Sequence, residues 1–213
     1  MKRIVLLLAA ALCAAAVARA AEEEVVIRGN FPQLLARGET TTQMAQRIAV
    51  LIVNLDRMIA PPCGMKRFFD FAGADYVDMD NVSRRVDPGQ PGVWRIVVLG
   101  KGCWTPRTQN IFVFPRGGSP AELRLGVPGG SAAGVKHQQD ATRIVLREAN
   151  SIAARSNCTD RAFIVDTALT RARQTGKPWD EVWSTSDCEI VRKFSVMFAP
   201  QDDKMRISVV PAN

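Results

Sequence analysis

Two stretches of the chain follow one pattern, and this pattern decides the fold. Residues 94–115 read WRIVVLGKGCWTPRTQNIFVFP, and residues 179–200 read WDEVWSTSDCEIVRKFSVMFAP. In both, a Trp precedes a Cys by nine residues and a Pro follows that Cys by twelve. The residues just before each Pro are apolar and suit a β-strand. The repeated spacing predicts that the chain contains one unit written twice.

The agreement extends on both sides of these stretches. Upstream, a helical pattern runs from an Arg-Ile pair to a Cys, over residues 47–63 in the first copy and 143–158 in the second. Downstream, an apolar–Arg–apolar triplet stands shortly before a Pro, at residues 123–125 and again at 205–207. We therefore expect repeat 1 over residues 40–128 and repeat 2 over residues 137–213.

The segments outside the two repeats have compositions of their own. Residues 129–136 are rich in Gly, Ser and Ala, which is typical of a linker, and they contain neither a P-loop nor a G-x-G-x-x-G motif. Residues 21–39 form an N-terminal extension. The sequence leaves open whether part of this extension, residues 24–27, adds a strand to a sheet edge.

Each repeat begins with helical periodicity and continues with strand periodicity. The apolar stripes of the two helices comprise Met44, Ile48, Leu51, Ile52, Leu55 and Ile59 in repeat 1 and Ala141, Ile144, Val145, Ala149, Ile152 and Ala153 in repeat 2. Alternation follows: Phe163, Val165, Thr167 and Leu169 are expected on one face of the first strand of repeat 2. Three further strands follow in each copy.

We therefore predict an α+β fold with two tandem repeats, each a helix packed on a four-stranded antiparallel meander. This order of elements resembles a cystatin-like arrangement of a helix on a sheet. The resemblance is to a topology and rests on no family motif, so it implies a fold and no function.

The N-terminus has the composition of a secretory signal peptide. Lys2 and Arg3 precede an apolar stretch over residues 4–18, and Ala18-Arg19-Ala20 is a small-x-small cleavage signal. We expect residues 1–20 to be removed and the mature protein to be periplasmic or secreted. A spanning helix needs about 20 apolar residues, so no transmembrane span is expected after the leader is removed.

The charge of the mature chain is modest. Three of the 28 basic residues lie in the leader, and the 25 that remain face 21 acidic residues, which gives +4. The basic residues occur singly or in pairs rather than in a stripe interleaved with aromatic residues, so nucleic acid is not an expected partner.

Leader removal leaves four cysteines, Cys63, Cys103, Cys158 and Cys188. An even number in an exported chain predicts two disulfides, and gaps of 30 to 55 residues do not suit the paired knuckles of a zinc site. In each repeat one Cys opens the first strand and the other ends the second. These ends are neighbours in an antiparallel hairpin, which predicts the pairs Cys63–Cys103 and Cys158–Cys188. The two pairings that join one repeat to the other are the alternatives.

No constellation of catalytic residues is evident. His137 is the only histidine, and no nucleophile is placed beside it by the sequence. Asp78-x-Asp80 followed by Asn81 resembles a calcium loop, but the required Gly and Glu positions hold Ser83 and Gly89. A hard cation held by Asp75, Asp78 and Asp80 is the alternative. We expect no catalytic residues, no metal and no cofactor.

Trp94 and Trp179, at matching positions, are expected in the cores. Trp104 and Trp183 have no counterpart in the other copy, and we expect them, with Asp180 and Glu181, to form a possible binding surface. Asp180 and Glu181 are also the first pair to test for a carboxylate-dependent hydrolase, although adjacent strand residues point to opposite faces.

Three functions remain open at this level. We expect a non-enzymatic binding or envelope-associated module whose partner is an unknown protein or envelope component, acting through its sheets or through the cleft between the copies. The alternatives are a hydrolase of an envelope polymer and a secreted inhibitor of a hydrolase.

Overall fold

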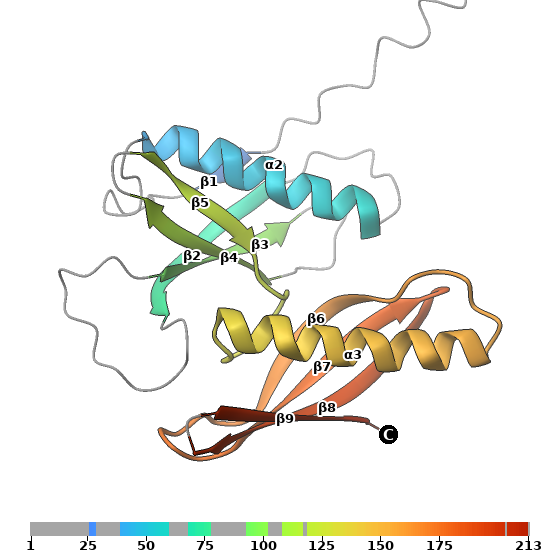
Figure 1. Cartoon of the computed structure of the whole chain (residues 1–213). Helices are drawn as coiled ribbons and strands as arrows, with labels where there is room; N and C mark the ends of the chain where they lie inside the picture. The colour runs from blue at the N-terminus through green and yellow to red at the C-terminus, as the bar shows by residue number, and fades with distance from the viewer. Residues whose placement is uncertain are drawn as a thin grey trace, which may run out of the picture.

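A computed structural model describes residues 26–28, 39–59, 68–77, 93–101, 108–116, 119–202 and 204–212. Within these residues, two helices and nine strands form two sheet units in tandem (Figure 1). The first unit contains β1 (Val26–Arg28), α2 (Thr41–Ile59), β2 (Phe68–Val77), β3 (Val93–Lys101), β4 (Thr108–Arg116) and β5 (Ser119–Leu125). The second contains α3 (Val135–Arg155), β6 (Phe163–Arg171), β7 (Trp179–Asp187), β8 (Ile190–Gln201) and β9 (Lys204–Pro211).

Four consecutive antiparallel strands form the body of each sheet, in the orders β2-β3-β4-β5 and β6-β7-β8-β9. The α+β class and the two tandem sheet units are thus confirmed. The first sheet has a fifth strand, because β1 pairs in parallel with β2 at the sheet edge. This strand lies in the N-terminal extension, where the sequence left the question open.

Each helix places its apolar stripe in a buried cluster. In the first cluster Met44, Ile48 and Ile52 of α2 lie with residues of β2 to β5, namely Phe69, Ile96, Val98, Ile111, Val113 and Ala121. In the second, Ala141, Val145 and Ala149 of α3 lie with Trp179, Trp183, Phe194, Val196 and Phe198. At about 25 cal/mol per Å² of apolar surface buried, such clusters are the main source of stability.

Local sequence explains where α2 begins. The backbone N–H of Thr40 donates to Oε1 of Gln43 at 2.8 Å, and the N–H of Gln43 donates to Oγ1 of Thr40 at 3.2 Å. This reciprocal pair is a capping box. No helix in the described part of the chain is both long enough and apolar enough to cross a membrane.

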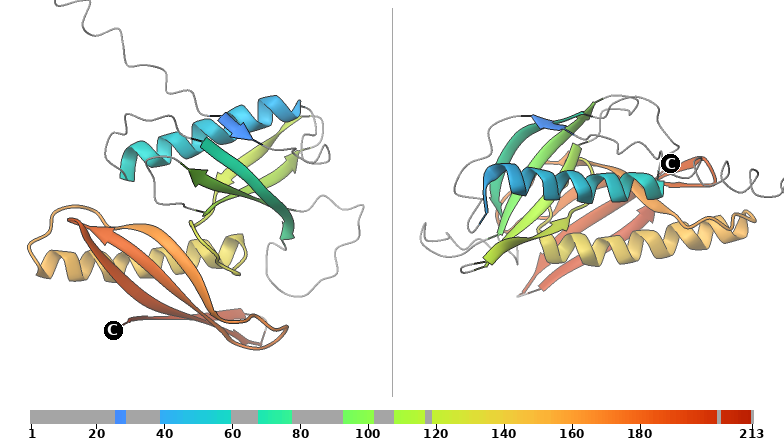
Figure 2. Two further views of the ribbon diagram at one scale, coloured as in Figure 1. Left: turned by 180° about the vertical axis from the view of Figure 1, so that it is seen from behind. Right: turned by 90° about the horizontal axis from the view of Figure 1, so that it is seen from above.

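The helices and sheets form four layers in the order α2, first sheet, α3, second sheet. Figures 1 and 2 show α2 on the side of the first sheet that faces away from the second unit, and α3 between the two sheets. Of the loop over residues 127–134, which connects the units, most residues are buried. Val135 and Lys136, expected in the linker, already belong to α3.

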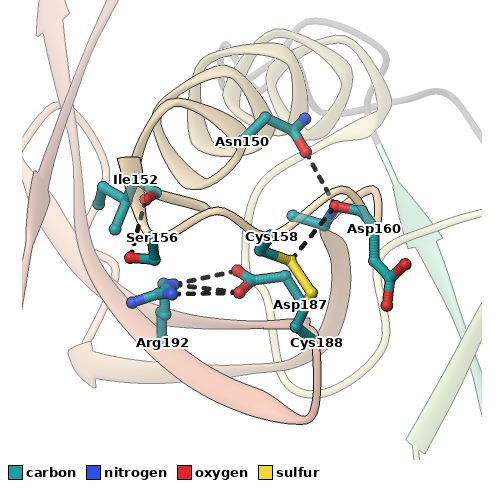
Figure 3. Close-up of a disulfide and its surroundings, with 9 residues drawn as sticks. Asn150, Ile152, Ser156, Cys158, Asp160, Asp187, Cys188 and Arg192 are labelled. Carbon is teal, nitrogen blue, oxygen red and sulfur yellow. Dashed lines mark hydrogen bonds and ion pairs between the residues drawn. A yellow bond between two sulfur atoms is a disulfide. The ribbon is translucent and has the colours of Figure 1, made fainter. Parts of the chain in front are cut away.

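The disulfide Cys158–Cys188 is present and joins the loop after α3 to the hairpin between β7 and β8 (Figure 3). Cys188 and Glu189 form the tip of this hairpin with φ values of 40° and 65°, a left-handed conformation that residues with a Cβ rarely adopt. Beside it, the fully buried Asp187 accepts from Nε of Arg192 at 3.0 Å. The predicted Cys63–Cys103 pair lies outside the described residues and stays a prediction.

Replacing Cys158 and Cys188 together with serine is expected to lower the free energy of unfolding by about 3 kcal/mol. The crosslink spans a sequence separation of 30, and opening a loop of that size returns chain entropy to the unfolded state. Urea unfolding followed by tryptophan fluorescence measures the change. An unchanged midpoint and slope would show that the crosslink does not stabilise the fold.

Candidate functional site

The segment that connects the units runs over the outer face of the first sheet. Side chains of β4 alternate, so that Ile111 and Val113 enter the first core while Asn110 and Phe112 point to the opposite face. The buried amide of Asn110 donates from Nδ2 to the carbonyls of Val127 (2.7 Å) and Gly129 (2.8 Å). One side chain of the first unit therefore fixes the path of the connecting segment.

The same segment is bonded to the second unit. The N–H of Gly130 donates to the carbonyl of Thr167 on β6 at 2.6 Å, and the hydroxyl of Thr167 donates to the carbonyl of Pro128 at 2.7 Å. Gly129 has φ +94°, and a Cβ added there would lie 2.3 Å from the carbonyl oxygen of Thr167. Only glycine combines this backbone conformation with so close an approach.

Glu181 attaches the segment to the second core. Its carboxylate is fully buried and accepts three hydrogen bonds, from the N–H of Ala132 (2.8 Å), from Nε1 of Trp179 (3.0 Å) and from Nε1 of Trp183 (2.8 Å). Both indole donors and the loop amide thus share one acceptor group. Such a buried carboxylate is stable only while its donors remain in place.

A small apolar cluster lies where the two units meet. Val93 and Phe112 of the first sheet and Val135, the first residue of α3, are all buried, and Phe114 packs against them. Gln138 supports this contact from the first turn of α3, because its Oε1 accepts from the N–H of Val127 at 3.0 Å and its Nε2 donates to the carbonyl of Ala133 at 2.9 Å.

Beside this cluster, a groove of about 520 Å³ opens between the units. Its size is within the range of ligand sites. Both units contribute to its lining, which consists of Leu55, Phe112, Arg124, Leu125, Gly126, Val127, Pro128, Val135, Gln138, Gln139, Thr142, Arg143, Leu146, Phe163 and Ile164. Most of these side chains are apolar, two are arginines and none is acidic.

The two arginines are held by neighbouring groups. Arg124 donates from Nε to Glu122 at 2.6 Å and lies 4.7 Å from the ring centre of Phe114. Arg143, mostly exposed, forms an ion pair with Asp140 one turn earlier on α3. Carboxylates thus orient both guanidinium groups, and the lining itself carries only positive charge.

The predicted binding surface is not assembled as expected. Trp183 and Glu181 are both fully buried, so neither lies on the surface as predicted. They share a face of β7 with Trp179, which is packed against Phe198 with 4.8 Å between the ring centres. Asp180 points to the other face and pairs with Arg171 at 2.8 Å. Trp104 lies outside the described residues.

The side-chain pair considered for hydrolysis is divided by the sheet. Glu181 lies in the core and Asp180 on the outer face, as strand alternation requires. A buried carboxylate that already accepts three hydrogen bonds does not reach a polymer, so these two residues do not act together as an acid and a base.

His137 is the third residue of α3, at the start of that helix, and its side chain is buried. Asp75 pairs with Arg95 at 2.7 Å, while Asp78 and Asp80 lie outside the described residues. Within the ranges that the structure describes, no group of three or more metal-ligating side chains occurs.

Sequence reasoning missed the groove and the polar side chains that build it. Asn110 and Gln138 belong to no motif, the two arginines were noted only as parts of the repeated pattern, and these four residues meet only after both units have folded. One signal was available: if Trp179 is a core residue, period-two alternation places Glu181 and Trp183 in the core as well.

With this geometry in view, the chain was compared with known proteins. Comparisons with protein-family models, with curated proteins and with solved structures found no match.

Proposed function

We propose that the protein is an exported, non-enzymatic binding module whose site is the groove between its two units. The leader sequence and the disulfide Cys158–Cys188 support export to an oxidising compartment. The groove supports binding, because it is apolar, continuous across both units and fixed by buried hydrogen bonds. The single observation that carries the proposal is a lining of apolar side chains with two arginines and no acidic group.

We propose further that the units are two copies of one helix and one four-stranded meander. The strand registers support this. Trp94 pairs with Val113 in the first sheet and Trp179 with Phe198 in the second, each residue 85 positions after its counterpart. Phe68 pairs with Lys101 in the first sheet, and Phe163 pairs with Ser186 in the second. Phe163 lies 95 positions after Phe68, and Ser186 lies 85 positions after Lys101. The same pairing thus recurs at both ends of the sheets.

The lining indicates the chemical class of the ligand. Burying an apolar body in the groove is favourable, since it removes apolar surface from water on both sides. The lining holds two guanidinium groups and no acidic group. Each arginine is ion-paired with a carboxylate outside the lining, Glu122 or Asp140, and an anionic end of a ligand would share their remaining donors, because arginine binds carboxylate and phosphate through paired donors. We therefore propose an amphipathic anion with an extended apolar body.

Binding of dodecanoate measured by isothermal titration calorimetry is expected, with dodecyltrimethylammonium as the ligand of opposite charge. Arg143→Gln and Arg124→Gln are each expected to weaken dodecanoate binding by about tenfold, since a charge-assisted hydrogen bond contributes about 1.5–3 kcal/mol. Arg147→Gln is the matched control, because Arg147 lies on the same helix, is 73% exposed and is not part of the lining.

Two results would contradict the proposed site. One is equal affinity for the cationic and the anionic ligand, which would remove the role of the arginines. The other is an equal loss for Arg147→Gln, which would mean that the net charge of the protein, rather than the groove, determines binding.

A further inference from the structure

The two sheets differ in what covers their outer faces. On the first sheet, Phe112 points away from α2 and is only 2% exposed, because residues 126–135 lie over it. On the second sheet, the face away from α3 carries Met197, which is 37% exposed, and Val210, which is 56% exposed. Figure 1 shows this second face at the end of the stack. The outer face of the first sheet is therefore covered by other residues of the same chain, whereas the outer face of the second sheet is exposed.

The open face occupies the equivalent register. Asn110 and Phe112 of β4 correspond to Ser195 and Met197 of β8, again 85 positions later. Around Met197 most outward side chains on β7, β8 and β9 are small or apolar, namely Val182, Ser184, Ser195, Ser208 and Val210. Its register partner on β7 is Asp180, whose carboxylate is ion-paired with Arg171 at 2.8 Å. Charged groups, such as Lys193 and Arg206, lie at its margins. A face with this composition suits burial against protein better than contact with a charged polymer.

The opposite end of the stack carries the surface that would complement this face. In α3, the residues Gln139, Thr142, Arg143 and Leu146 face the first unit across the groove. The residues 96 positions earlier are Gln43, Gln46, Arg47 and Val50 of α2, and all four line a second concave surface of about 590 Å³. Val50 is 59% exposed there. The surface of α3 that faces the first sheet thus has a counterpart on α2, and this counterpart is exposed.

The sequence before the two helices agrees with this correspondence. An apolar residue followed by Pro precedes a Gly by the same number of positions in both copies, with Phe31, Pro32 and Gly38 in the first and Val127, Pro128 and Gly134 in the second. Each Gly stands nine positions before the matched arginine, Arg47 or Arg143.

We propose that a second copy of this chain docks the α2 surface around Val50 onto the open sheet face around Met197. The contact repeats the relation of α3 to the first sheet, so copies join head to tail. Each surface carries an ion pair, Arg47 with Glu39 beside Val50 and Arg171 with Asp180 beside Met197, so docking buries no unpaired charge. The inference rests on the duplication proposed above and not on the ligand of the groove.

A head-to-tail contact has a property that a symmetric dimer lacks. Each copy retains one free surface of each kind after docking, so assembly continues beyond two copies unless the rotation closes a ring. A variant blocked on one surface retains the other surface intact.

The experiment uses sedimentation velocity on the full exported chain with its disulfide oxidised. Met197→Asp blocks the sheet face, and Val50→Asp blocks the helix face. Leu169→Asp is the control, because Leu169 is 41% exposed but pairs with the inward-facing Glu181 rather than with the open face. The wild type and Leu169→Asp are expected to form dimers and larger species as concentration rises, whereas each blocked variant alone remains monomeric, with association weakened at least tenfold.

The decisive sample is an equimolar mixture of the two blocked variants. Its members are expected to form a one-to-one dimer and nothing larger, because one intact surface remains on each partner. A wild type that stays monomeric overturns the proposal. The proposal is also overturned if Val50→Asp still dimerises while Met197→Asp does not, because that result indicates a symmetric contact between two sheet faces. Dodecanoate titration of the blocked variants reports separately on the groove.

Discussion

Gly129→Ala is expected to lower the free energy of unfolding by about 4–5 kcal/mol. Alanine at φ +94° is strained, which costs about 1–3 kcal/mol. The added methyl group would also lie 2.3 Å from Thr167 O and 2.4 Å from Thr167 N. These are backbone atoms of a paired strand and do not move aside as a flexible side chain does, so the overpacking adds a further penalty.

Gly176→Ala provides the matched control for this prediction. Gly176 also has positive φ, +71°, but a Cβ added there would meet no atom within 4 Å. Its alanine variant therefore incurs the conformational cost alone, about 1 kcal/mol. Chemical unfolding of both variants measures the difference. Equal losses would mean that the packing of residues 126–134 against β6 contributes nothing.

Glu181→Ala is expected to be at least as damaging, with a loss of about 5 kcal/mol. The variant leaves two buried indole N–H groups and the partly buried N–H of Ala132 without an acceptor, and each unsatisfied buried group costs about 1–3 kcal/mol. It also leaves a cavity between Trp179 and Trp183. The emission of these two indoles reports the change directly, alongside unfolding in urea.

Glu181→Gln separates the hydrogen bonds from the packing. Glutamine fills the same volume and retains one oxygen as an acceptor for Ala132 and Trp179, but its amide nitrogen would face Nε1 of Trp183. We expect a loss intermediate between the wild type and the alanine variant. Asp180→Ala, on the outer face of the same strand, should change stability by less than about 1 kcal/mol, because it removes only a surface ion pair. A comparable loss for Asp180→Ala would contradict the role assigned to Glu181.

The regular elements of this fold are readable from local sequence. The i, i+3, i+4 stripe of α2 and the alternation along β7 each report one buried face, because a helix and a strand present their side chains at fixed periods. The Cys158–Cys188 pairing followed from the same reasoning, since the ends of an antiparallel hairpin meet. These predictions required no knowledge of contacts between distant elements.

The face of the sheet on which each side chain of β6 lies was harder to predict from the sequence. Phe163, Val165, Thr167 and Leu169 were expected on one face, but a bulge between Ile164 and Asp166 shifts the alternation. Ile164 therefore joins the second core and Phe163 lines the groove. A bulge inserts one residue without a fixed sequence signature, so period counting cannot locate it.

The groove could not be predicted because its lining comes from segments as far apart as Leu55 and Ile164. Its geometry depends on Asn110 and Gln138, which are polar residues in otherwise ordinary positions. Their partners are backbone atoms of residues 127–133, and backbone atoms carry no residue identity.

The connecting segment makes the two halves mutually dependent. Its backbone supplies partners to Asn110 in one half and to Thr167 and Glu181 in the other. Local opening of either half therefore removes hydrogen-bond partners from the other half, and the cooperativity of unfolding extends across the boundary between the two units. Two units joined in this way are not separable into two independent proteins.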